Sequence, residues 1–176
     1  MTLFRRFKRD RRGVAAVEFA LIAPIMVLLY FGLAELCQAM IAERKANHVA
    51  SAVGDVVAQF QTVTPSTLDD VFSIGNLVMS PFPTSTLQMR VTSITANASA
   101  VPKVDWSYGK GGLAALSAGS TVTIPIALTA GDSVVMSESK YQFTSPVQIV
   151  VKNALNYSEV YYLRPRRSDQ VTCTTC

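Results

Sequence analysis

The feature that most constrains this chain is a long apolar segment near its N-terminus. Residues 19–34 read FALIAPIMVLLYFGLA and carry no charge. Extending the segment back to residue 14 adds one charge, Glu18. As an α-helix, residues 14–34 would be about 31 Å long, the thickness of a bilayer's hydrocarbon core. A buried helix of a soluble domain rarely runs this far without a polar interruption, so we expect a membrane-spanning helix.

The composition fits one such segment attached to one ordinary domain. The chain has 176 residues, of which 49% are hydrophobic and only 16% are charged, whereas soluble domains carry about 25% charged residues. A disordered chain is excluded because the sequence is too apolar. A disulfide-dense mini-protein is excluded because the chain has only three cysteines.

Positive charge is concentrated before the apolar segment. Residues 1–13 carry six basic residues and one acidic residue, whereas the whole chain has a net charge of only +4. The basic pI therefore does not indicate a nucleic-acid partner. A basic run directly before an apolar span predicts a cytoplasmic N-terminus and an exported C-terminal body.

The junction between the basic run and the apolar segment carries a specific pattern. Residues 11–24 read RRGVAAVEFALIAP: the basic run ends in Gly13, four small or apolar residues follow, and then come Glu18 and Phe19. This pattern resembles the class III signal of type IV prepilins and pseudopilins, and more narrowly that of the Flp/Tad class. The resemblance implies that a prepilin peptidase cleaves between Gly13 and Val14 on the cytoplasmic side.

Glu18 also has a physical explanation in this setting, because an ionisable group inside an apolar helix is costly without a partner. Cleavage before Val14 would create an α-amino group that is mostly protonated at neutral pH. Glu18 lies four residues further along on the same helical face, so it could pair with that amine or with a neighbouring subunit's amine. Solvation of Glu18 among the lipid headgroups is the alternative.

Two other export signals compete with this interpretation. The tripeptide GLA at residues 32–34 has the small-x-small form of a signal-peptidase site, which would release a secreted protein. Against it, Glu18 and Pro24 interrupt the apolar region that such a signal needs. Arginine pairs in the leader suggest the twin-arginine pathway, but the residues around them fit it poorly.

The helical pattern continues beyond the apolar segment. Apolar residues recur at intervals of three and four with charged residues between or just before them, which is typical of an amphipathic helix. We expect one helix over residues 14–61, about 70 Å long, with a kink at Pro24. The apolar positions of its second half are Ala46, Val49, Ala50, Val53, Val57 and Phe60.

The rest of the chain is expected to form an α+β head. Ser66 is the expected N-cap of a helix over residues 67–79, with Asp69 and Asp70 near its positive end. Beyond residue 84 the apolar period changes to two, which indicates β-strands. The β-rich runs are residues 86–93, 101–108, 120–128, 132–143, 147–152 and 159–163. The fold class is therefore α+β, with the long helix packed on one face of a small antiparallel sheet.

Several segments extend the resemblance over nearly the whole chain, and they are similar to TadE-family proteins. They are FGLAE at residues 31–35, VDWSY at 104–108, GDSV at 131–134, YQFTSP at 141–146 and YLRPRR at 162–167. The family implies a minor pilin or pseudopilin of the tight-adherence (Flp) pilus machinery, anchored in the inner membrane. A major pilin of that class is far shorter and lacks such a head.

Residues with catalytic chemistry are few. His48 is the only histidine, and a surface or packing role suits it best. The GKGG run at residues 109–112 lacks the P-loop spacing, so we expect a hairpin loop there. Helix-terminus and turn positions explain the aspartates that could be taken for acid–base or calcium pairs, which are Asp69 with Asp70 and Asp105 with Asp132. We therefore expect no enzyme, and no catalytic, metal or cofactor site.

The cysteines and some charged residues leave alternatives open. Cys173 and Cys176 form a CxxC without the βαβ context of a redox motif; a local disulfide, a bond to another subunit and free thiols all remain open. Cys37 is expected to be a free, small apolar residue. Glu35 is expected to be solvated at the interface or to contact a partner helix. A solvated sheet edge is expected for Arg164, Arg166 and Arg167.

We thus expect a basic cytoplasmic leader (1–13), a transmembrane helix with an amphipathic extension (14–61) and a periplasmic head (62–176). The resemblance implies a minor pilin in the assembly of Flp/Tad-type pili, and hence in surface adhesion. The implied partners are the prepilin peptidase, other pilins, inner-membrane assembly proteins and the lipid bilayer, with no nucleic acid. A single-pass anchored periplasmic binding module and a type II secretion pseudopilin are the alternatives.

Overall fold

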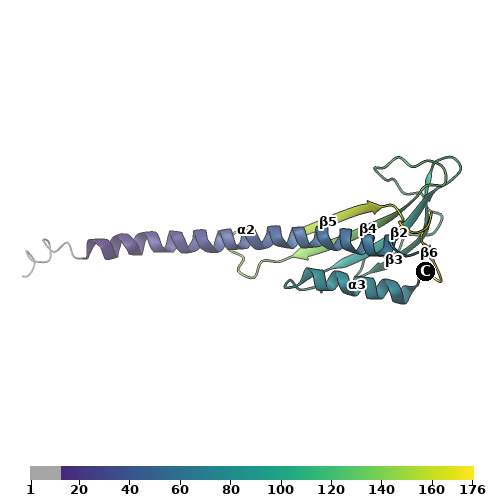
Figure 1. Cartoon of the computed structure of the whole chain (residues 1–176). Coiled ribbons are helices and arrows are strands. Elements are labelled where there is room, and N and C mark those ends of the chain that lie inside the picture. Colours follow the sequence, from purple (N-terminus) through teal and green to yellow (C-terminus); the bar gives the residue numbers. More distant parts are fainter. Residues whose placement is uncertain (1–12) are drawn as a thin grey trace, which may run out of the picture.

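One long helix organises the molecule, and half of it stands free of the rest (Figure 1). The computed structural model describes residues 13–176, so the basic leader up to residue 12 lies outside the described residues. Helix α2 runs over Val14–Ala58, and the head packs along its second half. The chain therefore has a stalk, which is the free first half of α2, and a folded head. The two share one continuous helix.

The head is a small sheet with one additional helix. Its elements are β1 (Thr62–Val63), α3 (Pro65–Met79), β2 (Gln88–Ala96), β3 (Pro102–Lys110), β4 (Ser133–Phe143), β5 (Leu155–Leu163) and β6 (Thr172–Cys173). The main sheet has the order β3-β2-β4-β5, and all its neighbouring strands are antiparallel. Strands β1 and β6 form a separate parallel pair. The expected α+β class, with a long N-terminal helix on a small antiparallel sheet, is confirmed.

The sheet has an apolar core on each face, because strand residues alternate between its two sides. On the helix side, Val91 and Val135 pack with buried residues of α2 and α3. On the other side, Ile94, Val134 and Met136 pack with apolar residues of the connection between β3 and β4. The head is therefore a three-layer arrangement of helices, sheet and a covering loop.

The buried face of α2 follows the predicted pattern. Five of the six predicted apolar positions are buried, but Phe60 is 37% exposed and lies beyond the helix. The helix ends at Ala58 rather than residue 61: the amides of Gln59 and Phe60 donate to carbonyls only three residues back, and the chain then enters β1 at Thr62. Pro24 lies inside the helix, which continues through it.

Helix α3 begins earlier than predicted. Thr64, not Ser66, is its N-cap: the Thr64 hydroxyl accepts the Thr67 amide at 3.3 Å, and Pro65 occupies the first helical turn. With this earlier start, Asp69 no longer lies in the first turn. Its carboxylate instead accepts a hydrogen bond from Lys110 at 2.6 Å, and that bond lowers the pKa of Asp69.

Residues 120–128 do not form the predicted strand. They pair with β3 only at one end, through a bridge between Lys103 and Thr121 and two backbone hydrogen bonds, from the Val104 amide to the Ser120 carbonyl and from the Val122 amide to the Pro102 carbonyl. Val122 and Ile124 do bury apolar surface, but they do so by packing on the outer face of the sheet. The alternating apolar residues of this run therefore belong to a loop that covers the sheet and not to a strand of it.

The glycine run at residues 109–112 forms a turn rather than a hairpin loop. Strand β3 ends at Lys110, and Gly111 and Gly112 follow with positive φ angles of 78° and 106°. The next strand, β4, pairs with β2 and not with β3. The turn therefore leads into the covering loop described above.

Candidate functional site

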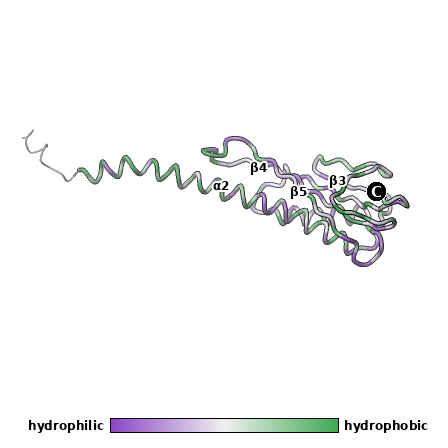
Figure 2. Tube along the Cα trace, turned by 90° about the horizontal axis from the view of Figure 1, so that it is seen from above, coloured by the Kyte–Doolittle hydropathy of each residue, from purple (hydrophilic) through white to green (hydrophobic). Residues whose placement is uncertain are grey.

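The free half of α2 is an apolar surface without any cover from the rest of the protein. Its most apolar window of 18 residues has a mean hydropathy of 2.3 and none of it is buried within the molecule. Phe19 is 73% exposed and Leu21 is 68% exposed. Figure 2 colours most of this half as hydrophobic. Apolar surface on this scale indicates contact with lipid or protein, and the long helix fits a membrane anchor.

The predicted processing residues lie at the very start of this helix. Gly13 precedes the first helical residue, Val14, and its carbonyl accepts the Val17 amide at 3.1 Å. Gly13, Val14, Glu18 and Phe19 are all exposed. The structure thus places the Gly13–Val14 bond at the exposed end of α2. Val14 and Glu18, four residues apart in the helix, lie on one face.

Glu35 marks the point where the free half of α2 meets the head. Its side chain is only 2% exposed. Its carboxylate accepts three consecutive backbone amides, from Ile149 at 2.7 Å, Val150 at 2.8 Å and Val151 at 2.9 Å. The sequence analysis expected Glu35 to be solvated at the interface or to contact a partner helix. Both expectations are wrong, because the buried carboxylate fastens a head loop to α2.

This contact also explains why residues 147–152 do not form the predicted strand. Amide hydrogen bonds to an ionised carboxylate are stronger than amide hydrogen bonds to a neutral carbonyl of a neighbouring strand. The amides that a strand would have offered to a neighbouring strand are directed at Glu35 instead. The sequence of this run, VQIVVK, gives no sign of that partner.

The hydrogen bonds keep Glu35 ionised. Burial alone would raise the pKa of Glu35, but the amides of Val151, Ile149 and Val150 and the Ser145 hydroxyl lower it from the ordinary 4.5 to about 2. The group therefore carries a full negative charge at neutral pH. Its position, one residue beyond the apolar segment 14–34, places this charge at the end of the apolar stalk.

Further contacts fix the head to the second half of α2. Tyr157 donates its hydroxyl to the Ala39 carbonyl at 3.0 Å, and Ser139 donates to the Ala46 carbonyl at 2.7 Å. Asn47 donates to the Glu159 carboxylate at 3.2 Å. Small residues let the sheet approach closely: a Cβ on Gly54 would lie 2.5 Å from Leu163 Cδ1. Stalk and head are thus joined along the whole second half of the helix.

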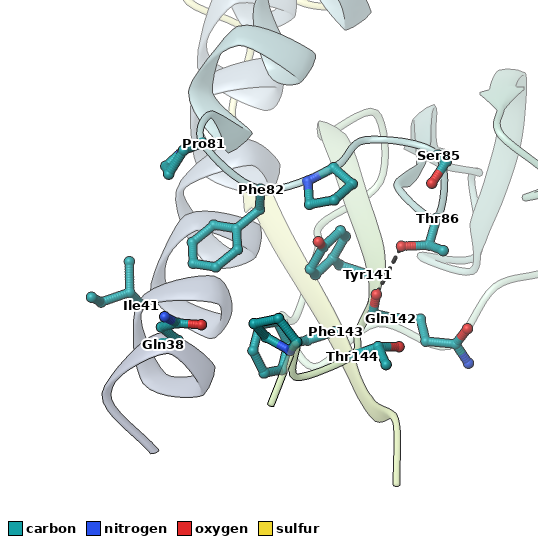
Figure 3. A pocket seen from close by; sticks show the side chains of 12 residues that line it. Gln38, Ile41, Pro81, Phe82, Ser85, Thr86, Tyr141, Gln142, Phe143 and Thr144 are labelled. Carbon is teal, nitrogen blue, oxygen red and sulfur yellow. Dashed lines mark hydrogen bonds between the residues drawn. The ribbon is translucent and has the colours of Figure 1, made fainter. Parts of the chain in front are cut away.

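A groove of about 670 Å³ lies between α2, the connection from α3 to β2, and the end of β4. Figure 3 shows Ile41 of α2, Phe82 of the connection, and Tyr141 and Phe143 of β4 at its sides. The rings of Phe82 and Phe143 meet edge to face with centroids 5.9 Å apart. No charged residue lines the groove in the described part of the chain, so its walls offer packing rather than catalytic chemistry.

The remaining candidates occupy separate places. His48 is exposed on α2, and Asp132 accepts the Thr129 amide at 3.0 Å in a turn, as predicted. Cys173 and Cys176 are joined by a disulfide, and Cys37 is an exposed free thiol.

The three arginines make no shared patch: Arg164 contacts Asp132 and Arg166 contacts Asp55, and no ion pair involves Arg167 in the described residues.

Comparison with known proteins bears on the anchor rather than on the head. The model of the family described as "TadE-like protein" matches residues 13–55. No curated protein and no solved structure matches the chain. The matched range begins at Gly13, includes Glu18 and Glu35, and covers α2 up to its last three residues. Residues 13–55 are thus a TadE-like segment, and the resemblance to the TadE family that the sequence indicated is confirmed there.

Proposed function

We propose that this protein is a membrane-anchored minor pilin, or pseudopilin, that takes part in the assembly of Flp/Tad-type pili and hence in surface adhesion. In this role it is not an enzyme. Its stalk spans the inner membrane with the N-terminus in the cytoplasm and the head in the periplasm. Its partners are the prepilin peptidase, other pilins, the inner-membrane assembly proteins and lipid.

One observation carries the proposal. The wholly exposed apolar half of α2 starts directly after Gly13, within the segment that matches TadE-like proteins. A basic leader before that glycine orients the insertion. An exposed bond between Gly13 and Val14 suits a protease that acts at the cytoplasmic face.

The chemistry of assembly follows from the new N-terminus. Hydrolysis before Val14 leaves a protonated amine one helical turn from the carboxylate of Glu18. Within one chain the two groups neutralise each other in the apolar surroundings. Between chains, the amine of one subunit and Glu18 of the next would set the stagger of neighbouring helices.

Transfer of the stalk from lipid into a filament requires little hydrophobic free energy. Lipid chains and the apolar side chains of neighbouring helices are similar surroundings, so packing and polar pairing decide the association. The exposed side chains of the free half, including Phe19 and Leu21, would become the contacts between subunits. The head would remain outside the helical bundle.

The test is deletion of the gene followed by complementation with single variants. Deletion should abolish surface pili, and the wild-type gene should restore them. Glu18→Gln should fail to restore pili, because the pairing with the amine is lost. The matched control Glu43→Gln, an exposed glutamate on the same helix, should restore them.

Two results would contradict the proposal. Normal piliation in the deletion strain would remove the protein from pilus assembly. Loss of secreted enzymes with intact pili would assign it to a type II secretion system instead.

A further inference from the structure

The loop between β4 and β5, residues 144–154, lies beside α2 where the free half of the helix ends (Figures 1 and 2). We refer to it as the junction loop. A Cβ on Gly32 would lie only 2.9 Å from Val150 Cγ2, and Glu35 binds the amides of three residues of the loop. Gly32 belongs to the last turn of the apolar segment 14–34. The loop is therefore level with the end of the span and not with the middle of the head.

The tip of the junction loop is apolar and exposed. Residues 146–151 read PVQIVV and carry no charge. Val147 is 44% exposed and Val150 is 54% exposed. At the same level of the helix, Leu33 and Leu36 are 55% and 46% exposed. The apolar surface of the stalk thus adjoins the loop tip where Gly32 lies against Val150, and Gln148 is the one polar residue of the six.

The backbone amides of the loop tip donate their hydrogen bonds to side chains of the protein itself. Pro146 has no amide hydrogen. The amides of residues 147 and 148 both donate to the Ser145 hydroxyl, at 3.3 Å each, and those of residues 149, 150 and 151 donate to Glu35. Every amide from residue 147 to residue 151 therefore has a protein partner and needs no water. Irregular backbone near lipid requires such internal partners.

We propose that the junction loop is a second membrane contact, which inserts Val147 and Val150 into the outer interface of the bilayer that α2 spans. Lipid is the occupant that this surface favours, because the surface continues that of the apolar stalk. The inference rests on the proposed anchoring of residues 14–34. It adds that the head is held against the membrane at two points and not only through the helix.

Charge beside the tip supports a lipid partner. Lys152 directly follows the apolar run and is exposed. A lysine at this level can keep its ammonium group among phosphate groups while its methylene chain stays in apolar surroundings. Glu35, the acidic group nearest to the tip along the contact, is turned inward and occupied by amides. The exposed face of the loop therefore presents apolar side chains flanked by a positive charge.

The experiment uses the full chain in vesicles of phosphatidylethanolamine and phosphatidylglycerol. Cys37 is replaced by serine, and an environment-sensitive fluorophore is attached to a single new cysteine. The test position is Val150→Cys. Leu28→Cys reports the span, and Val101→Cys is an exposed apolar control at the opposite end of the sheet, beyond the β2 residue Ala96.

The expected result is graded by position. The label at residue 150 should show blue-shifted emission and quenching by lipids that carry a nitroxide near the headgroup. The label at residue 101 should show neither effect, and the label at residue 28 should be quenched by a nitroxide deep in the acyl chain. Glu35→Gln should reduce the quenching at residue 150, because its amide hydrogens oppose those of the loop. The control Glu43→Gln should leave the quenching unchanged.

Three outcomes would overturn the inference. If residue 150 behaves like residue 101 while residue 28 is in lipid, the loop does not touch the membrane but the anchor stands. If residue 28 is also unquenched, the anchoring itself fails, and the proposed function fails with it. If residue 150 has blue-shifted emission but is unquenched by lipid at every protein-to-lipid ratio while residue 28 stays quenched, a second protein copy and not lipid covers the loop.

Discussion

Two glutamates in one apolar helix have opposite surroundings. Glu18 is exposed on the free half of α2, whereas Glu35 is 2% exposed and accepts three backbone amides. The sequence places both residues in or beside an apolar run and cannot distinguish them, because the partners of Glu35 lie more than a hundred residues further along the chain. The exposure of Glu18 is compatible with the proposed pairing between subunits, whereas the buried carboxylate of Glu35 holds a head loop to α2.

The pH dependence of stability tests the role of Glu35. Its pKa of about 2 lies below the ordinary 4.5, so its ionised form stabilises the fold above pH 4.5, and this contribution is lost as the pH falls from 4.5 towards 2. We expect Glu35→Gln to lower Tm at neutral pH, with the gap to wild type closing over that acidic range. Thermal unfolding in detergent, followed by Trp106 fluorescence, measures it.

The control for this prediction is Glu43→Gln, which removes an exposed acid from the same helix. Its Tm gap should be small and should not close in the same acidic range. A gap for Glu35→Gln that stays constant from neutral to acidic pH would show that the charge of Glu35 does not hold the loop.

Among the helices and strands, the spacing of apolar residues predicted those elements that bury one face. The three-and-four spacing predicted the buried face of α2, and alternation predicted the main strands β2, β3 and β4. It failed for residues 120–128 and 147–152, although both runs are rich in apolar residues. In each case a tertiary partner decided the outcome: the outer face of the sheet for the first run and Glu35 for the second.

The close contact between α2 and the sheet gives a prediction at this scale. A Cβ on Gly54 would lie 2.5 Å from Leu163 Cδ1 and 2.9 Å from Ser137 Cβ. Gly54→Val should therefore destabilise the head by about 1–3 kcal/mol, because the sheet must move away from the helix. Denaturant unfolding in detergent, with Trp106 as the probe, measures the loss. Trp106 reports the head because its indole N–H donates to the Val171 carbonyl at 2.7 Å in the core.

A matched substitution separates overpacking from helix propensity. Ala52→Val adds a β-branched side chain two residues away, at a half-buried position of the same helix, and should cost less than about 1 kcal/mol. Equal losses for the two variants would contradict close packing at Gly54.

At the scale of the whole molecule, the division into an apolar stalk and an α+β head was predictable, because hydropathy and a change of period mark it in the sequence. The way the two parts are joined was not. The junction depends on contacts such as Tyr157 to Ala39 and Glu35 to the junction loop, which connect residues far apart in the sequence. The second half of α2 and the sheet are consequently packed as one unit.

The N-terminal sequence of the protein isolated from bacterial envelopes tests whether the basic leader is removed from the membrane-spanning stalk. We predict Val14 as the first residue when the prepilin peptidase is active, and Met1 when it is absent. Met1 in the presence of an active peptidase, or Glu35 as the first residue, would contradict it.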